Sequence, residues 1–141
     1  MTTLGVIGLG RIGAFHTDTL SGLDAVDGLV ITDERPELVA AVAAKHDVTP
    51  ADSVDKLLSS GIDGVVVAAA TPAHAELTLA AVERGIPTFC EKPIAATAAE
   101  SARVADVIAR VLKPGADVAA LRGEVGELAG RFPLYQGLEG W

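Results

Sequence analysis

The chain has few aromatic residues and a single cysteine. Aromatic residues make up 4% of its 141 residues, although half of the residues are hydrophobic. The core must therefore consist mainly of valine, isoleucine, leucine and alanine, which is typical of a parallel β-sheet buried between helices. Cys90 has no second cysteine to pair with, so an internal disulfide is excluded and a reducing cytoplasm is indicated.

The sequence also lacks long hydrophobic runs and an excess of positive charge. No apolar run is long enough to cross a bilayer, and no basic region precedes the first apolar residues. Nineteen acidic residues against eleven basic ones give a net charge of −8, which argues against nucleic-acid and membrane-surface partners. We expect a soluble cytoplasmic protein, and we expect no metal.

Short apolar runs alternate with stretches of helical periodicity over the first 112 residues. The patterns predict strands over 4–7, 29–31, 64–70 and 86–90. They predict helices over 11–23, 36–45, 53–58, 72–85 and 97–112. The helix starts carry their own signals, with Pro36 in a first turn, Ser53 and Thr71 as N-caps and a capping box from Thr97 to Glu100. This alternation is typical of an α/β domain with a doubly wound parallel sheet and right-handed crossovers.

The last part of the chain has a different composition. Residues 116–121 are compatible with one more strand, so we expect a single domain over 1–121 and an irregular tail over 122–141. Three of the five aromatic residues, Phe132, Tyr135 and Trp141, lie in the last ten positions. Because exposed aromatic groups can dock on another surface, we expect a partner chain or an oligomer contact through this tail.

A glycine-rich turn follows the first predicted strand and opens the first helix. Its residues match G-x-G-x-x-G and are Gly8, Leu9, Gly10, Arg11, Ile12 and Gly13. The first glycine permits a tight turn, the second lets the backbone approach a pyrophosphate, and the third lets the helix pack closely on the strand. The helix N-terminus favours a bound anion. A turn without a ligand is the alternative, but the flanking strand and helix favour a dinucleotide site in a Rossmann fold.

An acidic residue follows the second predicted strand. Asp33 lies twenty residues after Gly13, where a carboxylate accepts hydrogen bonds from the adenosine ribose. It would repel a 2′-phosphate, so NAD is expected. Arg35 leaves NADP as the alternative, because an arginine just past this strand can accommodate that phosphate.

Two further loops carry polar residues at predicted strand ends. Thr71, Pro72 and His74 follow Ala70, and His74 has the alternative of an ordinary surface histidine on the first turn. Glu91-Lys92-Pro93 follows the last strand, where a lone lysine in a solvated loop is the alternative. The loops after the predicted strands 4–7, 64–70 and 86–90 meet where such sheets bind ligands, and this convergence favours a functional interpretation of both loops.

Together, G-L-G-R-I-G with His16 three residues later, T-P-A-H and F-C-E-K-P resemble the Gfo/Idh/MocA family of sugar and inositol dehydrogenases over residues 3–112. The resemblance implies that Lys92 assists catalysis at the nicotinamide end and that its bond to Pro93 is cis. It implies that residues 71–74 line the nicotinamide-ribose region and that Asp33 holds the adenosine ribose. His16 would lie near the cofactor, with a packed helix histidine as the alternative.

The sequence departs from this family after Leu112. Family members carry a second α/β domain for the substrate, often with a D-x-x-x-H pair whose histidine is the general acid/base. All three histidines here precede Lys92, so no such pair follows it. We expect His46 to be a solvated residue at a helix end and Cys90 to be a small buried residue at a strand end, neither with a catalytic role. Residues 122–128 resemble, faintly, the start of that domain. We expect a cofactor-binding domain that is incomplete as a catalyst. The alternatives are an NAD(H)-sensing or partner-dependent module and a degenerate fragment.

Overall fold

The computed structural model describes residues 1–112 of the chain. Within them, parallel strands form one sheet in the order β3-β2-β1-β4-β5. The strands are β1 (Thr3–Ile7), β2 (Gly28–Thr32), β3 (Thr49–Pro50), β4 (Gly64–Val67) and β5 (Thr88–Cys90). The helices are α1 (Arg11–Ser21), α2 (Pro36–Lys45), α3 (Val54–Leu58), α4 (Thr71–Glu83) and α5 (Ala98–Leu112). The expected strand over 116–121, the end of the domain at 121 and the tail over 122–141 lie outside the described residues.

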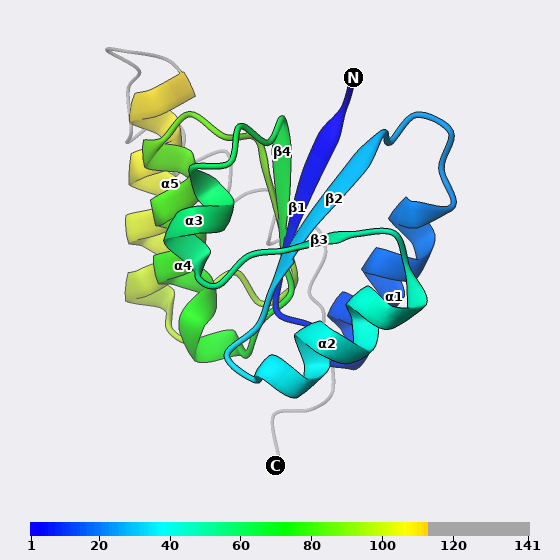
Figure 1. Cartoon of the computed structure of the whole chain (residues 1–141). Coiled ribbons are helices and arrows are strands. Elements are labelled where there is room, and N and C mark those ends of the chain that lie inside the picture. Colours follow the sequence, from blue (N-terminus) through cyan, green and yellow to red (C-terminus); the bar gives the residue numbers. More distant parts are fainter. Residues whose placement is uncertain (113–141) are drawn as a thin grey trace.

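The helices cover both faces of the sheet, as Figure 1 shows. Helices α1 and α2 lie on one face, and α3, α4 and α5 lie on the other. The central strand β1 pairs with β2 on one side and β4 on the other, with Val6 opposite Ile31 and Val66. This is the doubly wound α/β sheet that the sequence predicts, and it places the ends of β1 and β4 side by side.

Aliphatic side chains fill both layers of the core. Val6 and Ile31 are fully buried with Leu9 and pack against α1 and α2. Ile7 and Leu57 belong to the opposite layer, against α3 and α4. Because strand residues alternate between faces, Val6 and Ile7 enter different layers. No aromatic side chain is among the buried core residues that the structure describes.

Several predicted helix starts are confirmed. Pro36 is the first residue of α2, and the Ser53 hydroxyl accepts a hydrogen bond from the Lys56 amide at 3.2 Å. The capping box also forms, because the Thr97 amide donates to Glu100 at 3.0 Å and the Glu100 amide donates to the Thr97 hydroxyl at 3.2 Å. These local hydrogen bonds satisfy amides that the first helical turn leaves free.

Other boundaries differ from the prediction. Strand β4 ends at Val67 instead of residue 70, and Thr71 is the first residue of α4 instead of its N-cap. Residues 68 and 69 turn against the backbone of Gly8, and the Ala70 carbonyl then accepts the first helical bond from Ala73 at 2.9 Å. Strand β5 begins at Thr88 because Pro87 has no amide to donate. Helix α1 ends at Ser21, with Gly22 as its C-cap.

The two-residue strand β3 is absent from the prediction. Thr49 and Pro50 pair with Val30 and Ile31 at the edge of the sheet, and both residues are exposed. Neither a period-2 pattern nor an apolar run marks so short an edge strand.

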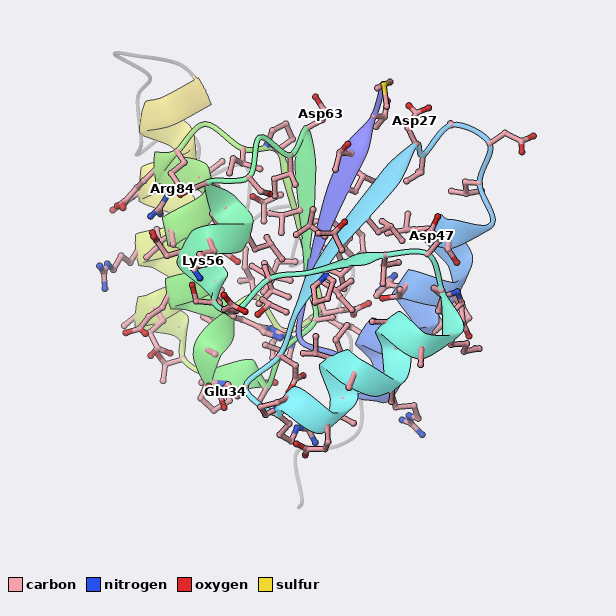
Figure 2. All side chains as sticks on the ribbon, in the orientation of Figure 1. Asp27, Glu34, Asp47, Lys56, Asp63 and Arg84 are labelled. Atoms are coloured by element: carbon pink, nitrogen blue, oxygen red, sulfur yellow. The ribbon has the colours of Figure 1, made fainter. Side chains whose placement is uncertain are left out.

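Figure 2 labels Asp27 and Asp63 at the end of the sheet where β1 begins. Their carboxylates accept hydrogen bonds from the backbone amides of Thr2 and Thr3. In the described part of the chain, no helix combines the length and the apolar character that a bilayer crossing requires.

Candidate dinucleotide site

The glycine-rich turn between β1 and α1 is shaped by contacts that exclude side chains. Gly8 has a φ of +90°, and a Cβ placed there would lie 2.5 Å from the Ala69 backbone. A Cβ at Gly13 would lie 1.8 Å from the Gly8 carbonyl oxygen. These two glycines therefore serve the turn and the helix–strand contact that the sequence predicts.

Gly10 has a different environment. A Cβ there would have only the Arg35 guanidinium nearby, at 3.9 Å, so the space beside Gly10 is open. Gly10 is the N-cap of α1 and makes no side-chain cap hydrogen bond, which leaves amides of the first turn free for a ligand. An open approach and free amides at a helix N-terminus suit a pyrophosphate.

Asp33 connects the end of β2 to the glycine-rich turn. Its Oδ2 accepts a hydrogen bond from the Leu9 amide at 2.6 Å. Its Oδ1 accepts from the Arg35 amide at 2.9 Å and from Arg35 Nε at 3.1 Å. Burial raises the pKa of Asp33, but the hydrogen bonds from Leu9 and Arg35 outweigh it, and the pKa lies below its ordinary value. Asp33 is therefore a fixed carboxylate.

A cavity of about 850 Å³ opens at this edge of the sheet. Its lining includes the predicted residues Gly8, Gly10, Arg11, Ile12, Asp33 and Ala70. Leu9 and Gly13 are buried beneath the turn and do not line it. The cavity is large enough for part of a dinucleotide, and its position suits the adenosine and pyrophosphate portions.

The lining also contains residues that the sequence does not assign to a binding site. Asp52 and Ser53 follow β3, and Glu34 follows Asp33. The rule that ligands lie at the carboxyl ends of strands would have indicated the loop after β3, but β3 itself was not predicted. Asp52 forms an ion pair with Lys56, and the pKa of Asp52 is lowered by that hydrogen bond.

The other predicted site residues do not line this cavity. They lie at the start of α4 and in the loop after β5. Thr71, Pro72, His74, Glu91, Lys92 and Pro93 are absent from the cavity lining. The peptide bond between Lys92 and Pro93 is cis, as the resemblance implies.

Glu91 is held by α1. Its Oε1 lies 2.7 Å from His16 Nε2, and its amide donates to the Val67 carbonyl at 2.9 Å. The hydrogen bond from His16 lowers the pKa of Glu91. The His16 ring also meets the Phe89 ring edge-on, with 5.6 Å between centroids. His16 is therefore a partly buried partner of the loop after β5.

His74 is buried, so its interpretation as a surface histidine is wrong. It is 2% exposed, and its two ring nitrogens lie 2.7 Å from the Pro93 carbonyl oxygen and 2.8 Å from the Ala69 carbonyl oxygen. The side chain points inward from the first turn of α4, because that turn packs over the ends of β4 and β5. His74 thus contacts two loops of the site.

The remaining polar residues serve other purposes. His46 is not solvated as a helix-end residue would be; its ring is mostly buried and lies 2.6 Å from Asp18, at the opposite edge of the sheet. Cys90 is half-buried, and burial raises the pKa of its thiol, which disfavours a nucleophilic thiolate. Among the described residues, no group of three or more His, Cys, Asp or Glu is placed to hold a metal ion.

Comparison with known proteins identifies the family. The family model for the GFO_IDH_MocA oxidoreductase family, NAD-binding Rossmann fold, matches residues 2–113. Inositol 2-dehydrogenase 1 of Saccharopolyspora erythraea is 43% identical over 105 residues, which are 72% of this chain and 31% of that protein. The myo-inositol 2-dehydrogenase of Thermotoga maritima is 34% identical over 113 residues, covering 74% of this chain and 34% of that protein.

Solved structures agree with the sequence comparisons. A Gfo/Idh/MocA family oxidoreductase from Vibrio cholerae superposes with a TM-score of 0.75 at 28% identity, over 81% of this chain and 37% of that chain. The WlbA dehydrogenase of Bordetella pertussis, crystallised with NADH and UDP-GlcNAcA, gives a TM-score of 0.71 at 25% identity, over 77% of this chain and 34% of that chain. The chain spans about a third of the length of the curated relatives it matches. With its Rossmann sheet and its match over residues 2–113, the chain belongs to the Gfo/Idh/MocA oxidoreductases and contains their NAD-binding domain.

Proposed function

We propose that this chain binds NAD for hydride transfer to or from a sugar or polyol of the inositol type. The N-terminus of α1 beside Gly10 would hold the pyrophosphate, and Asp33 would accept hydrogen bonds from the adenosine ribose. Lys92 and residues 70–74 would hold the nicotinamide and its ribose. Bound NAD supplies the hydride acceptor, and Lys92 helps to hold or move the proton of the substrate hydroxyl. The inositol dehydrogenases among the relatives support this substrate class.

The observation that carries the proposal is the position of Asp33. Its carboxylate is 7% exposed, lines the cavity and is hydrogen-bonded to the glycine-rich turn. A ribose diol can approach such a carboxylate, whereas a 2′-phosphate would meet its negative charge. Arg35 is already paired with Asp33, so it offsets only part of this repulsion. We therefore propose a preference for NAD over NADP.

We propose that these residues bind cofactor but do not turn over substrate alone. Hydride transfer requires a substrate carbon held against the nicotinamide and a group that moves the alcohol proton. The sequence has no histidine after Lys92 that could act as general acid/base. The substrate pocket must therefore come from residues outside the described domain or from another chain. We also propose a cytoplasmic location, which the single cysteine favours. The net charge of −8 supports a dinucleotide, and not nucleic acid, as the ligand.

Titration of the purified chain with NADH and, separately, with NADPH tests this proposal. We expect saturable binding with tighter affinity for NADH, and no steady reduction of NAD in the presence of inositol or simple sugars. Gly10→Val is the matched control, because a Cβ at Gly10 would enter the open ligand space with only the Arg35 guanidinium nearby, at 3.9 Å. If a folded wild-type chain binds neither nucleotide, the proposal is wrong. Steady turnover of inositol would contradict the proposed incompleteness.

A second candidate is an NAD(H)-binding module that functions with a partner chain. The observation in its favour is an exposed apolar surface formed by Phe15 and Phe89, which are 63% and 56% exposed. Phe15 and Phe89 both lie against the His16 ring, so they form one patch. Size-exclusion chromatography with light scattering, in the presence and absence of NADH, tests this candidate. A monomer at every concentration, with or without NADH, would argue against self-association through this surface.

A further inference from the structure

Lys92 lies between two residues that are each bound to a histidine from a different helix. Glu91 contacts His16 on α1 at 2.7 Å, and the Pro93 carbonyl contacts His74 on α4 at 2.7 Å. We call His16 and His74 the histidine pair. The Lys92 side chain itself makes no hydrogen bond or ion pair that the described residues show. The lysine is therefore positioned through the backbone on either side of it.

His74 is the more buried member of the histidine pair. Its ring is 2% exposed, whereas the His16 side chain is 20% exposed and its partner Glu91 is 27% exposed. Both ring nitrogens of His74 face backbone carbonyl oxygens. A buried carbonyl that loses its donor cannot turn to water for a replacement, so each of these contacts resists local opening.

His74 also connects Lys92 to the glycine-rich turn. Its Nε2 lies 2.8 Å from the Ala69 carbonyl oxygen, and the Ala69 backbone lies so close to Gly8 that a Cβ on Gly8 would be 2.5 Å away. The contacts therefore run from Gly8 through Ala69 and the His74 ring to Pro93. This series joins the proposed pyrophosphate end of the site to the proposed nicotinamide end.

We propose that His74 is a positioning residue that fixes the Lys92–Pro93 segment relative to the dinucleotide, with His16 as its weaker counterpart. This inference rests on the proposed function for its ligand, but its structural part is independent of any ligand. Because the side chain is buried behind both loops, it acts through the backbone of residues 91–93 and does not contact the nicotinamide.

The variant His74→Phe keeps an aromatic ring and removes both ring nitrogens, and with them any N–H that the ring donates to the Ala69 and Pro93 carbonyls. Thr78→Val is the matched control, because Thr78 lies one turn further along α4, is 2% exposed, and its hydroxyl has the Cys90 thiol as the only hydrogen-bonding neighbour that the described residues show. Hydrogen exchange of the free protein reports on the segment through the amides of Glu91 and Lys92, which donate to the Val67 carbonyl and to the Glu91 carboxylate. We expect exchange there to be roughly tenfold faster in His74→Phe and unchanged in Thr78→Val, a factor that corresponds to the net effect of about one hydrogen bond. Unchanged exchange in His74→Phe would overturn the proposal.

Binding separates positioning from general damage. We expect the affinity for NADH to fall about three- to tenfold in His74→Phe, while the affinity for ADP-ribose, which lacks the nicotinamide, stays within about twofold of wild type. An equal loss for both ligands would overturn a positioning role. The variant His74→Gln retains a donor for one carbonyl, and we expect intermediate exchange rates and NADH affinity. If His74→Phe does not fold, His74→Gln decides by the same two measurements. If the wild-type chain binds neither nucleotide, the proposed function fails. The exchange measurement still tests whether His74 fixes the Lys92–Pro93 segment.

Discussion

The carboxyl edge of the sheet, where the parallel strands end, and the amino edge, where they begin, carry the same residue types. They differ in which ends of the surrounding helices lie there. At the carboxyl edge, His16 lies 2.7 Å from Glu91; at the amino edge, His46 lies 2.6 Å from Asp18. Each edge also has a cavity, of about 850 Å³ at the carboxyl edge and about 290 Å³ at the amino edge. Neither a histidine–carboxylate pair nor a cavity therefore distinguishes the two.

Helix polarity does distinguish them. Helices α1, α2 and α4 begin at the carboxyl edge without a side-chain cap, so amides and the positive ends of their dipoles point there. The same helices end at the amino edge, where carbonyls gather. Asp18 is already bound by Lys45 and His46, and the hydrogen bond from Lys45 is the main cause of its lowered pKa. A dinucleotide pyrophosphate is therefore favoured at the carboxyl edge alone.

The strongest test of the carboxyl edge is Gly13→Ala. The added methyl group would lie 1.8 Å from the Gly8 carbonyl oxygen, so α1 and the turn must separate. We expect a loss of at least about 3 kcal/mol in the free energy of unfolding, the upper part of the range for overpacked sites. Chemical denaturation followed by circular dichroism measures this loss. A variant as stable as wild type would show that the close helix–strand contact is not required.

Gly10→Val tests the ligand space without testing the fold. Gly10 has an extended backbone that valine adopts readily, and its side chain would meet only the end of Arg35. We expect the melting temperature to change by less than about 4 °C, corresponding to less than about 1 kcal/mol. NADH binding should be lost in calorimetry. Retained affinity would place the pyrophosphate elsewhere.

Asp33→Asn tests the carboxylate that joins β2 to the turn. Because the pKa of Asp33 is lowered in the folded state, its charge stabilises the fold at pH values above its ordinary pKa of 3.8. This contribution is lost as the pH falls through the lower folded pKa. We expect the variant to be about 1 kcal/mol less stable at pH 7, with the difference shrinking in acid. Thermal melts over a pH series measure it. In parallel titrations, the preference for NADH over NADPH should weaken.

Asp18→Asn at the amino edge should have the smallest effect. Its ion pairs with Lys45 and His46 lie at the surface, where such pairs contribute little. We expect the melting temperature to change by no more than about 3 °C, and NADH affinity to remain that of wild type. A loss of NADH binding comparable with that of Asp33→Asn would remove the distinction between the two edges.

The sequence was sufficient for the parts of the fold and site that depend on local signals. Pro36, Ser53 and the Thr97 capping box start helices as predicted, because each acts within one turn of its own residue. Gly8 and Gly13 have the contacts that their motif requires. The match to the NAD-binding family agrees with this interpretation.

The differences arise where tertiary contacts decide. Strand β3 has only two residues and owes its existence to pairing with β2. The burial of His74 depends on the Pro93 carbonyl, nineteen residues away in sequence. The contribution of Asp52 and Ser53 to the cavity depends on β3 lying next to β2. No pattern within a single segment contains this information.

The hydrogen bond from the Leu9 amide to Asp33 has a kinetic consequence. It fixes the glycine-rich turn against the end of β2 in the protein itself, so the turn need not rearrange before a dinucleotide docks. Association is then limited by encounter and orientation, and variants of this edge should differ mainly in how long the cofactor stays bound. Under the proposed function the domain exchanges oxidised for reduced cofactor, and we expect the Asp33 carboxylate to set the residence time of the dinucleotide.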